Sequence, residues 1–72
     1  MSKTRLNLKI FRMKMMLKQE EMAEKLGMSR SHYASIENGS RNGTQEFWFN
    51  LQKVFDLSDE EAWGLMRKNE DE

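Results

Sequence analysis

Apolar residues recur at intervals of three and four positions along almost the whole chain, which is the period of an α-helix. No stretch alternates apolar and polar residues as a half-buried β-strand would, and the chain contains no proline. The pattern predicts five helices, at about residues 4–15, 19–26, 30–38, 45–55 and from residue 58 onwards. We therefore predict one all-α domain over residues 1–68, followed by an acidic, frayed tail at residues 69–72.

Residues with special conformational roles stand at the predicted helix ends. Gly27 and Gly39 follow the second and third helices, where a residue with positive φ commonly ends a helix. The expected N-caps are Ser29, Thr44 and Ser58. Glu61 lies three residues after Ser58, which predicts a capping box at the start of the fifth helix.

The apolar positions of each predicted helix define the expected core. Their three- and four-residue spacing places them on one face of each helix. The residues expected to face inward are Leu8, Phe11, Met15, Met22, Ala23, Leu26, Tyr33, Ile36, Phe47, Trp48, Leu51, Val54, Phe55, Trp63 and Met66.

Residues 19–39, QEEMAEKLGMSRSHYASIENG, predict two short helices joined by a tight turn. Ala23 is small where a larger residue would push the two helices apart, Gly27 lets the chain reverse, and Met28 can fill the turn from beneath. This combination is the signature of a helix-turn-helix, whose second helix enters the major groove of DNA.

The spacing of eight residues also carries a resemblance to a known family. These residues are Gln19, Ala23, Gly27, Ser29, Ile36, Glu37, Asn38 and Gly39. With them, residues 8–57 resemble the phage-repressor and Cro-type (Xre-like) helix-turn-helix family. The resemblance implies a compact five-helix, lambda-repressor-like DNA-binding domain. It also implies a sequence-specific transcriptional regulator, of the type found as repressors in phages, plasmids or mobile elements.

The outward face of the third helix is expected to read DNA bases. Tyr33 and Ile36 point inward, so the remaining residues of this helix face out or flank the core. Arg30 lies near its N-terminal end, and arginine is the best reader of guanine O6 and N7. The resemblance implies that the base-reading residues are Ser29, Arg30, Ser31 and Ser35.

A second group of residues is expected to contact DNA phosphates, which position a protein without reading sequence. The resemblance implies that Gln19 bonds a phosphate and steadies a side chain of the recognition helix, and that Asn38 faces a phosphate. The full expected set is Lys18, Gln19, His32, Asn38, Ser40, Arg41 and Asn42. Lys18 stands where the family often has a small capping residue, so this cap is expected to be weaker. His32 is interpreted as a phosphate neighbour or an exposed side chain.

Arg12 and Glu37 are two charged residues beside apolar stripes, where an unpaired charge would be unfavourable. The simplest interpretation is that they form an ion pair with each other, and the resemblance implies the same link. We predict a structural role for this pair.

Phe47, Trp48 and Phe49 are consecutive, and a helix turns about 100° per residue, so they cannot all face one core. Phe49 shares its side with Gln52 and Lys53 and is therefore predicted to be exposed. An exposed phenylalanine suggests a contact surface. In the family, the start of the fourth helix and the region of the last two helices often form a dimer interface. We expect a homodimer that binds double-stranded DNA at an inverted repeat, with Phe49 in the interface.

Composition and charge narrow the picture further. The chain has 72 residues, no cysteine and one histidine, so neither a disulfide nor a metal site is expected, and no cofactor. No apolar run approaches the roughly 18 residues of a membrane span, and no signal peptide is recognisable, so a cytoplasmic protein is expected. The net charge is zero. However, residues 1–18 carry six basic and no acidic residues, which predicts one positive edge toward DNA, with the acidic C-terminal part pointing away.

The two alternatives to DNA binding are a protein-interaction module and an enzyme. Helix-turn-helix domains of this family also occur in antitoxins, and near-neutral charge fits such a protein-interaction module. An enzyme is not expected, because no nucleophile–base pair, carboxylate pair or phosphate loop stands out, and no small-molecule ligand is expected either. Strongly salt-dependent binding would favour DNA as the partner.

Overall fold

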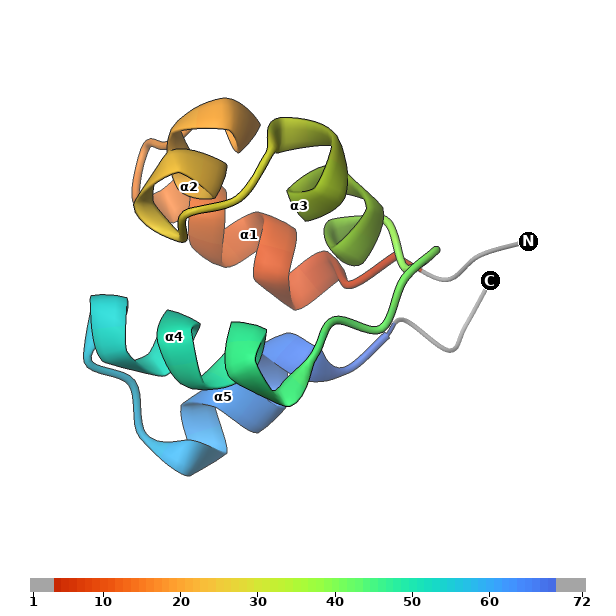
Figure 1. The fold of residues 1–72 in the computed structure, drawn as a ribbon. Coiled ribbons are helices and arrows are strands. Elements are labelled where there is room, and N and C mark those ends of the chain that lie inside the picture. Colours follow the sequence, from red (N-terminus) through yellow and green to blue (C-terminus); the bar gives the residue numbers. More distant parts are fainter. Residues whose placement is uncertain (1–3, 69–72) are drawn as a thin grey trace.

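The computed structural model describes residues 4–68, and these form five helices with no strand among them (Figure 1). The helices are α1 (Leu6–Lys14), α2 (Gln19–Lys25), α3 (Arg30–Glu37), α4 (Gln45–Phe55) and α5 (Asp59–Met66). The prediction of an all-α, five-helix fold is confirmed. The predicted frayed tail at residues 69–72 lies outside the described residues.

The five helices form two groups that meet at α1. Helices α2 and α3 pack against each other, and α4 and α5 do the same (Figure 1). Helix α1 contacts both α3 and α5 and so joins the two groups. This arrangement leaves α3 at one end of the molecule, with one side against the core and the other toward solvent.

The three predicted serine and threonine caps are confirmed. The hydroxyls of Ser29, Thr44 and Ser58 each accept the backbone N–H of the residue three positions on, at 3.1–3.2 Å. Lys18 has no acceptor on its side chain and cannot cap α2 in this way. Instead the Glu21 carboxylate accepts the backbone N–H of Lys18 at 2.8 Å, which is one half of a capping box.

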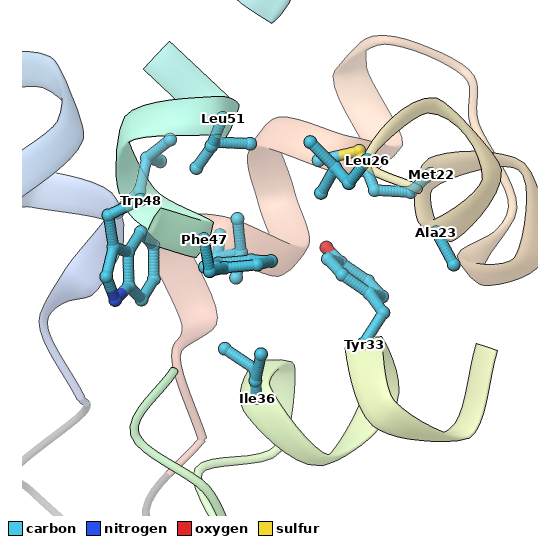
Figure 2. Close-up of a cluster of buried hydrophobic side chains, with 10 residues drawn as sticks. Met22, Ala23, Leu26, Tyr33, Ile36, Phe47, Trp48 and Leu51 are labelled. Atoms are coloured by element: carbon cyan, nitrogen blue, oxygen red, sulfur yellow. The ribbon is translucent and has the colours of Figure 1, made fainter. Parts of the chain in front are cut away.

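The core contains side chains from all five helices. Figure 2 shows part of it, with side chains from α2, α3 and α4 directed toward one another. Leu8, Met22, Tyr33, Ile36 and Leu51 have no exposed surface. Phe47 and Trp48 pack edge to face, with ring centroids 4.7 Å apart, a preferred geometry for aromatic pairs.

The inward orientation predicted for four residues is wrong. Helix α5 packs through Ala62 and Leu65, and this rotates Trp63, which is 67% exposed, away from the core. Residues Met15, Val54 and Met66 are also exposed. Met15 lies beyond the last residue of α1, so helical spacing no longer determines where its side chain points.

Arg5 has an unexpected position. Helix α1 begins at Leu6, two residues after the predicted start, and the backbone N–H of Arg5, its N-cap residue, donates to the Glu37 carbonyl at 2.8 Å. Its buried guanidinium donates to four backbone carbonyls, those of Ile36, Arg41, Asn42 and Met66. The charge also lies 5.4 Å from the centre of the Trp48 ring, within the range of a cation–π contact.

The predicted positive edge is therefore smaller than the sequence suggested. Arg5 is buried and bonded within the fold, and Arg12 is held by Glu37, so neither charge is free to meet a phosphate. Lys9, Lys14 and Lys18 are exposed. Helix formation placed these basic residues on different faces, although they lie close together in the sequence.

Candidate nucleic-acid interface

The turn between α2 and α3 is built from Ala23, Gly27 and Met28. Ala23 is buried, and its carbonyl accepts the backbone N–H of Met28 at 3.0 Å, which closes the turn. Gly27 has φ +70°, a conformation that glycine adopts readily. A Cβ atom there would meet nothing within 4 Å, so the backbone angle alone accounts for the glycine.

Helix α3 has a buried and an exposed side. Tyr33 and Ile36 are buried, whereas Arg30 and Ser31 are exposed. Ser29, the N-cap, is also exposed. The outward side of the first turn of α3 therefore carries small hydroxyl side chains around one guanidinium, which is an arrangement that can approach base edges closely.

Ser35 differs from the other predicted base readers. It is half-buried, and its hydroxyl donates to the carbonyl of His32 at 2.7 Å. The hydroxyl proton is thus used within α3. The hydroxyl oxygen can still accept a hydrogen bond, so Ser35 can bind a base amino group while it keeps its own bond to the His32 carbonyl.

The Arg12–Glu37 ion pair is buried between α1 and α3. The Nε atom of Arg12 donates to Glu37 Oε2 at 2.8 Å, and the two side chains are 11% and 4% exposed. Arg12 Nη1 also donates to the Leu17 carbonyl at 2.7 Å. Tyr33 Oη donates to Glu37 Oε2 at 2.7 Å, so the carboxylate is held from two directions.

This network determines the charge state of Glu37. Burial alone would raise the pKa of the carboxyl, but hydrogen bonds from Arg12, Tyr33 and Gln19 hold the pKa below its ordinary value. Burial and the hydrogen bond to Glu37 raise the pKa of Tyr33, which keeps its proton for donation. The sequence interpretation assigned Tyr33 only to the core. Its position four residues before Glu37, on the same side of a helix, was the available signal.

Gln19 connects the buried network to the exposed side of α3. Its amide Nε2 donates to Glu37 Oε1 at 3.0 Å, and its Oε1 accepts from Arg30 Nη1 at 3.2 Å. An ionised carboxylate only accepts hydrogen bonds, so the amide must turn its NH2 group toward Glu37. The amide oxygen then points toward Arg30, and the buried carboxylate indirectly orients an exposed guanidinium.

The segment after α3 carries most of the other predicted phosphate contacts. Asn38 Oδ1 accepts the Ser40 backbone N–H at 2.9 Å, and the Arg41 N–H donates to the Ser35 carbonyl at 3.0 Å. The Arg41 and Asn42 carbonyls accept from Arg5. The backbone of this loop is thereby held in place, and the four side chains from Asn38, Ser40, Arg41 and Asn42 are exposed.

Gly43 allows this loop to lie against α4. It has φ +77°, and a Cβ atom there would be 3.1 Å from the indole nitrogen of Trp48. That nitrogen donates to the Asn42 carbonyl at 3.3 Å. Both the backbone angle and the close approach therefore require glycine.

The remaining predicted residues lie apart from this loop. Lys18 is exposed at the start of α2. His32 lines a groove between α3 and α4 together with Glu46 and Lys53. The structure thus brings Gln19 and Arg30 together directly, and joins Asn38 to Ser40.

Phe49 lines the groove that holds His32 and also a second groove, between α4 and α5. It is 60% exposed, and the second groove, of about 620 Å³, is also lined by Trp48, Trp63 and Met66. Trp63 has the largest exposed side chain in this groove. The sequence pattern predicted that Trp63 faces inward, so Trp63 was not among the residues expected in an interface. We call Phe49, Trp63 and Met66 the α4–α5 surface.

The close contact at Ala23, the glycine turn and the outward side of α3 define a helix-turn-helix DNA-binding domain. A family model described as "Helix-turn-helix" matches residues 8–61, three quarters of the chain. The chain belongs to this family, the Xre/Cro-like helix-turn-helix proteins, and its five helices form the corresponding lambda-repressor-like fold. The family is a DNA-binding and not an enzymatic type of domain. No curated protein and no solved structure matches the chain. Within residues 4–68, no helix has the length and apolar character needed to cross a membrane.

Proposed function

We propose that this protein is a sequence-specific transcriptional regulator that places α3 in the major groove of its operator. The observation that carries the proposal is the chain of hydrogen bonds from Glu37 through Gln19 to Arg30. It orients a guanidinium at the N-terminal end of α3, the part of a recognition helix that meets base edges. Bidentate contact of this guanidinium with guanine O6 and N7 is the strongest base-reading interaction available to α3.

The other base contacts come from hydroxyl groups. Ser29 and Ser31 flank Arg30 and are exposed, and Ser35 supplies an acceptor one turn further along α3. Serine can donate to or accept from several bases. Arg30 therefore provides most of the discrimination, and the serines refine it.

The phosphate contacts come from both ends of the helix-turn-helix. Lys18 and Arg41 supply exposed positive charges, and the exposed His32 side chain is a further phosphate neighbour. Gln19, Asn38, Ser40 and Asn42 contribute uncharged polar groups. Because Lys18 and Arg41 are always charged, we expect affinity to fall as the salt concentration rises, by the amount of at least about two neutralised phosphates.

The regulator binds as a homodimer through the α4–α5 surface. Phe49 and Trp63 are aromatic residues on one exposed groove, and aromatic residues are enriched in protein interfaces. A two-fold dimer places two copies of α3 about one helical turn apart, which requires an inverted repeat in the DNA. A compact domain bound at such a site represses by occupying a promoter, as expected for a phage, plasmid or mobile-element repressor.

Selection of bound duplexes from a random DNA pool, at about physiological salt, tests this proposal. We expect enrichment of an inverted repeat that contains a guanine in each half-site at the position contacted by Arg30. Enrichment of a single half-site would keep sequence-specific binding and contradict the dimer. Absence of any enriched sequence would contradict the proposal and favour an antitoxin-like or other protein-interaction module.

A further inference from the structure

An exposed apolar cluster on and beside α1 belongs to neither the DNA-binding residues nor the α4–α5 surface. Among residues 4–68, nine large apolar side chains are exposed, and five of these lie between residues 6 and 16. The five residues, with their exposed fractions, are Leu6 (43%), Ile10 (40%), Met13 (57%), Met15 (47%) and Met16 (89%). Isolated exposed apolar residues such as Met15 are ordinary, but several that share one side of a helix form a candidate interaction site.

Three of these residues form a stripe along α1. Leu6, Ile10 and Met13 are spaced by four and three positions, so they lie on the same side of the helix. Leu8 and Arg12 lie on the opposite side, where Leu8 is buried and Arg12 bonds Glu37. The stripe is therefore the outward face of α1.

The stripe continues into an apolar groove between α1 and α5. Ile10 lines this groove together with Phe11, Leu57 and Leu65. Apolar surface thus extends sideways from the stripe. An occupant that covers Ile10 can also fill this groove.

Met16 extends the exposed apolar stripe beyond the end of α1. It has φ 60°, in the left-handed region that favours glycine, and its side chain is the most exposed of the apolar set. Its backbone N–H donates to the Met13 carbonyl at 2.9 Å, so it directly adjoins the stripe. The positive φ belongs to the C-terminal cap of α1, since the Leu17 N–H also donates to the Arg12 carbonyl at 3.2 Å, and the Met16 side chain is left exposed beside the stripe.

The charges around the stripe indicate the chemistry of its occupant. Lys9 and Lys14 are exposed on either side of the stripe, and α1 contains no acidic residue. Glu61 of α5 lines the same groove as Lys14 and keeps its negative charge, so the acidic residues of an occupant are expected along the lysines and away from Glu61. The complementary shape is an apolar helix face bordered by aspartate or glutamate.

The same charges argue against two other occupants. In a two-fold contact of α1 against α1, neither copy offers a carboxylate from this helix to Lys9 and Lys14 of the other copy. An anionic membrane would meet the acidic first turn of α5, which contains Asp59, Glu60 and Glu61, beside the groove. A protein helix can avoid these carboxylates, whereas a flat anionic surface cannot.

We propose that the outward face of α1 docks an acidic amphipathic helix of a partner protein, with Leu6, Ile10, Met13 and Met16 as its apolar contacts. This is helix-in-groove recognition, in which apolar residues one turn apart anchor the partner. Methionine suits such a surface because its side chain is flexible and polarizable. The proposal does not depend on DNA binding, since it uses none of the residues assigned to that function.

A displayed library of helical peptides, randomised at every surface position and selected on the intact protein, tests the proposal. We expect the selected peptides to carry apolar residues three and four positions apart, bordered by aspartate or glutamate. The double variant Ile10→Gln/Met13→Gln should bind these peptides roughly tenfold more weakly or worse, as should Lys9→Glu/Lys14→Glu. Trp63→Gln, on the α4–α5 surface, is the matched control and should bind them unchanged. Circular dichroism establishes that each variant is folded.

Met16→Gly separates docking from stability. Relief of the left-handed strain should raise Tm by several degrees, while loss of the methionine side chain should weaken peptide binding. A purely structural residue would not show these opposite changes. Selected peptides without acidic borders, or peptides that bind the α1 variants as well as the original, would overturn the proposal. Co-sedimentation of the protein with phosphatidylglycerol vesicles, abolished by Ile10→Gln/Met13→Gln, would overturn it in favour of a membrane.

Discussion

Glu37 stabilises this domain and also organises its DNA-binding side chains. It accepts hydrogen bonds from Arg12, Tyr33 and Gln19, and two of these donors connect it to other helices. Arg12 joins it to α1, and Gln19 transmits its orientation to Arg30. We therefore expect a substitution at Glu37 to affect both stability and, if Arg30 reads bases as proposed, DNA recognition.

Replacing Glu37 by alanine should strongly destabilise the domain. The substitution leaves the Arg12 guanidinium buried without its partner, which typically costs about 3–5 kcal/mol. Urea unfolding monitored by circular dichroism measures this loss. Glu24→Ala, at an exposed position of α2, is the matched control and should change stability by less than about 0.5 kcal/mol. An unchanged Tm for Glu37→Ala would contradict a stabilising ion pair.

The lowered pKa of Glu37 makes part of the stability depend on pH. A carboxyl with a lowered folded-state pKa contributes its full stabilisation above the unfolded value, here 4.5, and loses it as pH falls through the folded value. The stability difference between the original protein and Glu37→Gln should therefore be constant near neutral pH and shrink below pH 4.5. Unfolding free energies measured across this range provide the test. A difference independent of pH would show that the carboxyl has the same pKa in both states.

Arg30 and Arg41 should differ in their effects on DNA binding. Arg30→Ala should weaken operator binding by about 1–3 kcal/mol and relax the preference at one base pair of each half-site. Arg41→Ala should weaken binding to all sequences alike and reduce the salt dependence by about one phosphate contact. Binding isotherms on the operator and its single-base variants, at several salt concentrations, distinguish the two. If Arg30→Ala kept full discrimination at every base pair, another residue would be the principal base reader.

The helices and their ends were predictable because their causes are local. Helical spacing, three hydroxyl caps and the glycines at positions 27 and 39 all act within a few residues of one another. The inward prediction for Trp63 failed because its orientation depends on how α5 docks. Spacing alone does not reveal that the docking uses Ala62 and Leu65.

Arg5 could not be predicted for a different reason. Its acceptors are backbone carbonyls, which every residue has, and they lie 31 to 61 positions away in the sequence. No residue type or spacing marks such acceptors. The sequence interpretation therefore counted Arg5 among the charges available to DNA, whereas the fold uses it to hold α3, the following loop and the end of α5 together.

Replacing Arg5 by methionine should loosen the loop after α3. The methionine keeps much of the apolar stem but leaves several carbonyls without donors, at a cost of about 1–3 kcal/mol each where they stay buried. We expect a loss of at least about 2 kcal/mol, measured by urea unfolding, with faster amide hydrogen exchange at residues 40–43. Lys9→Met, at an exposed position of α1, is the control. Unchanged exchange in the loop would show that other contacts, such as Trp48 with Asn42, hold it alone.

The molecule as a whole presents separate faces for separate partners. The exposed residues of α3 and the following loop face DNA in our proposal, the α4–α5 surface faces a second copy, and the outward face of α1 faces an acidic helix. A net charge of zero is compatible with this division, because charge of each sign is placed by face and not spread evenly.

Phe49→Glu should separate dimerisation from folding. Introducing a charge at the α4–α5 surface should weaken self-association, and with it operator affinity, by roughly tenfold or more, while Tm changes little because Phe49 is exposed. Sedimentation equilibrium and operator binding measure the two effects. Met13→Glu places the same charge on the outward face of α1 and should leave both unchanged. Equal self-association of Phe49→Glu and the original protein would exclude this surface as the dimer interface.

The hydrogen bond from Arg5 to the Met66 carbonyl affects when this chain can complete its fold during synthesis. Because synthesis runs from the N-terminus, the Met66 carbonyl is added 61 residues after Arg5. Until then its guanidinium lacks a complete set of acceptors, and α1 has no α5 to pack against. A nascent segment that stops before α5 therefore lacks both this acceptor and one of the packing partners of α1. We expect such a segment to be cleaved by proteases more readily than the segment that includes α5.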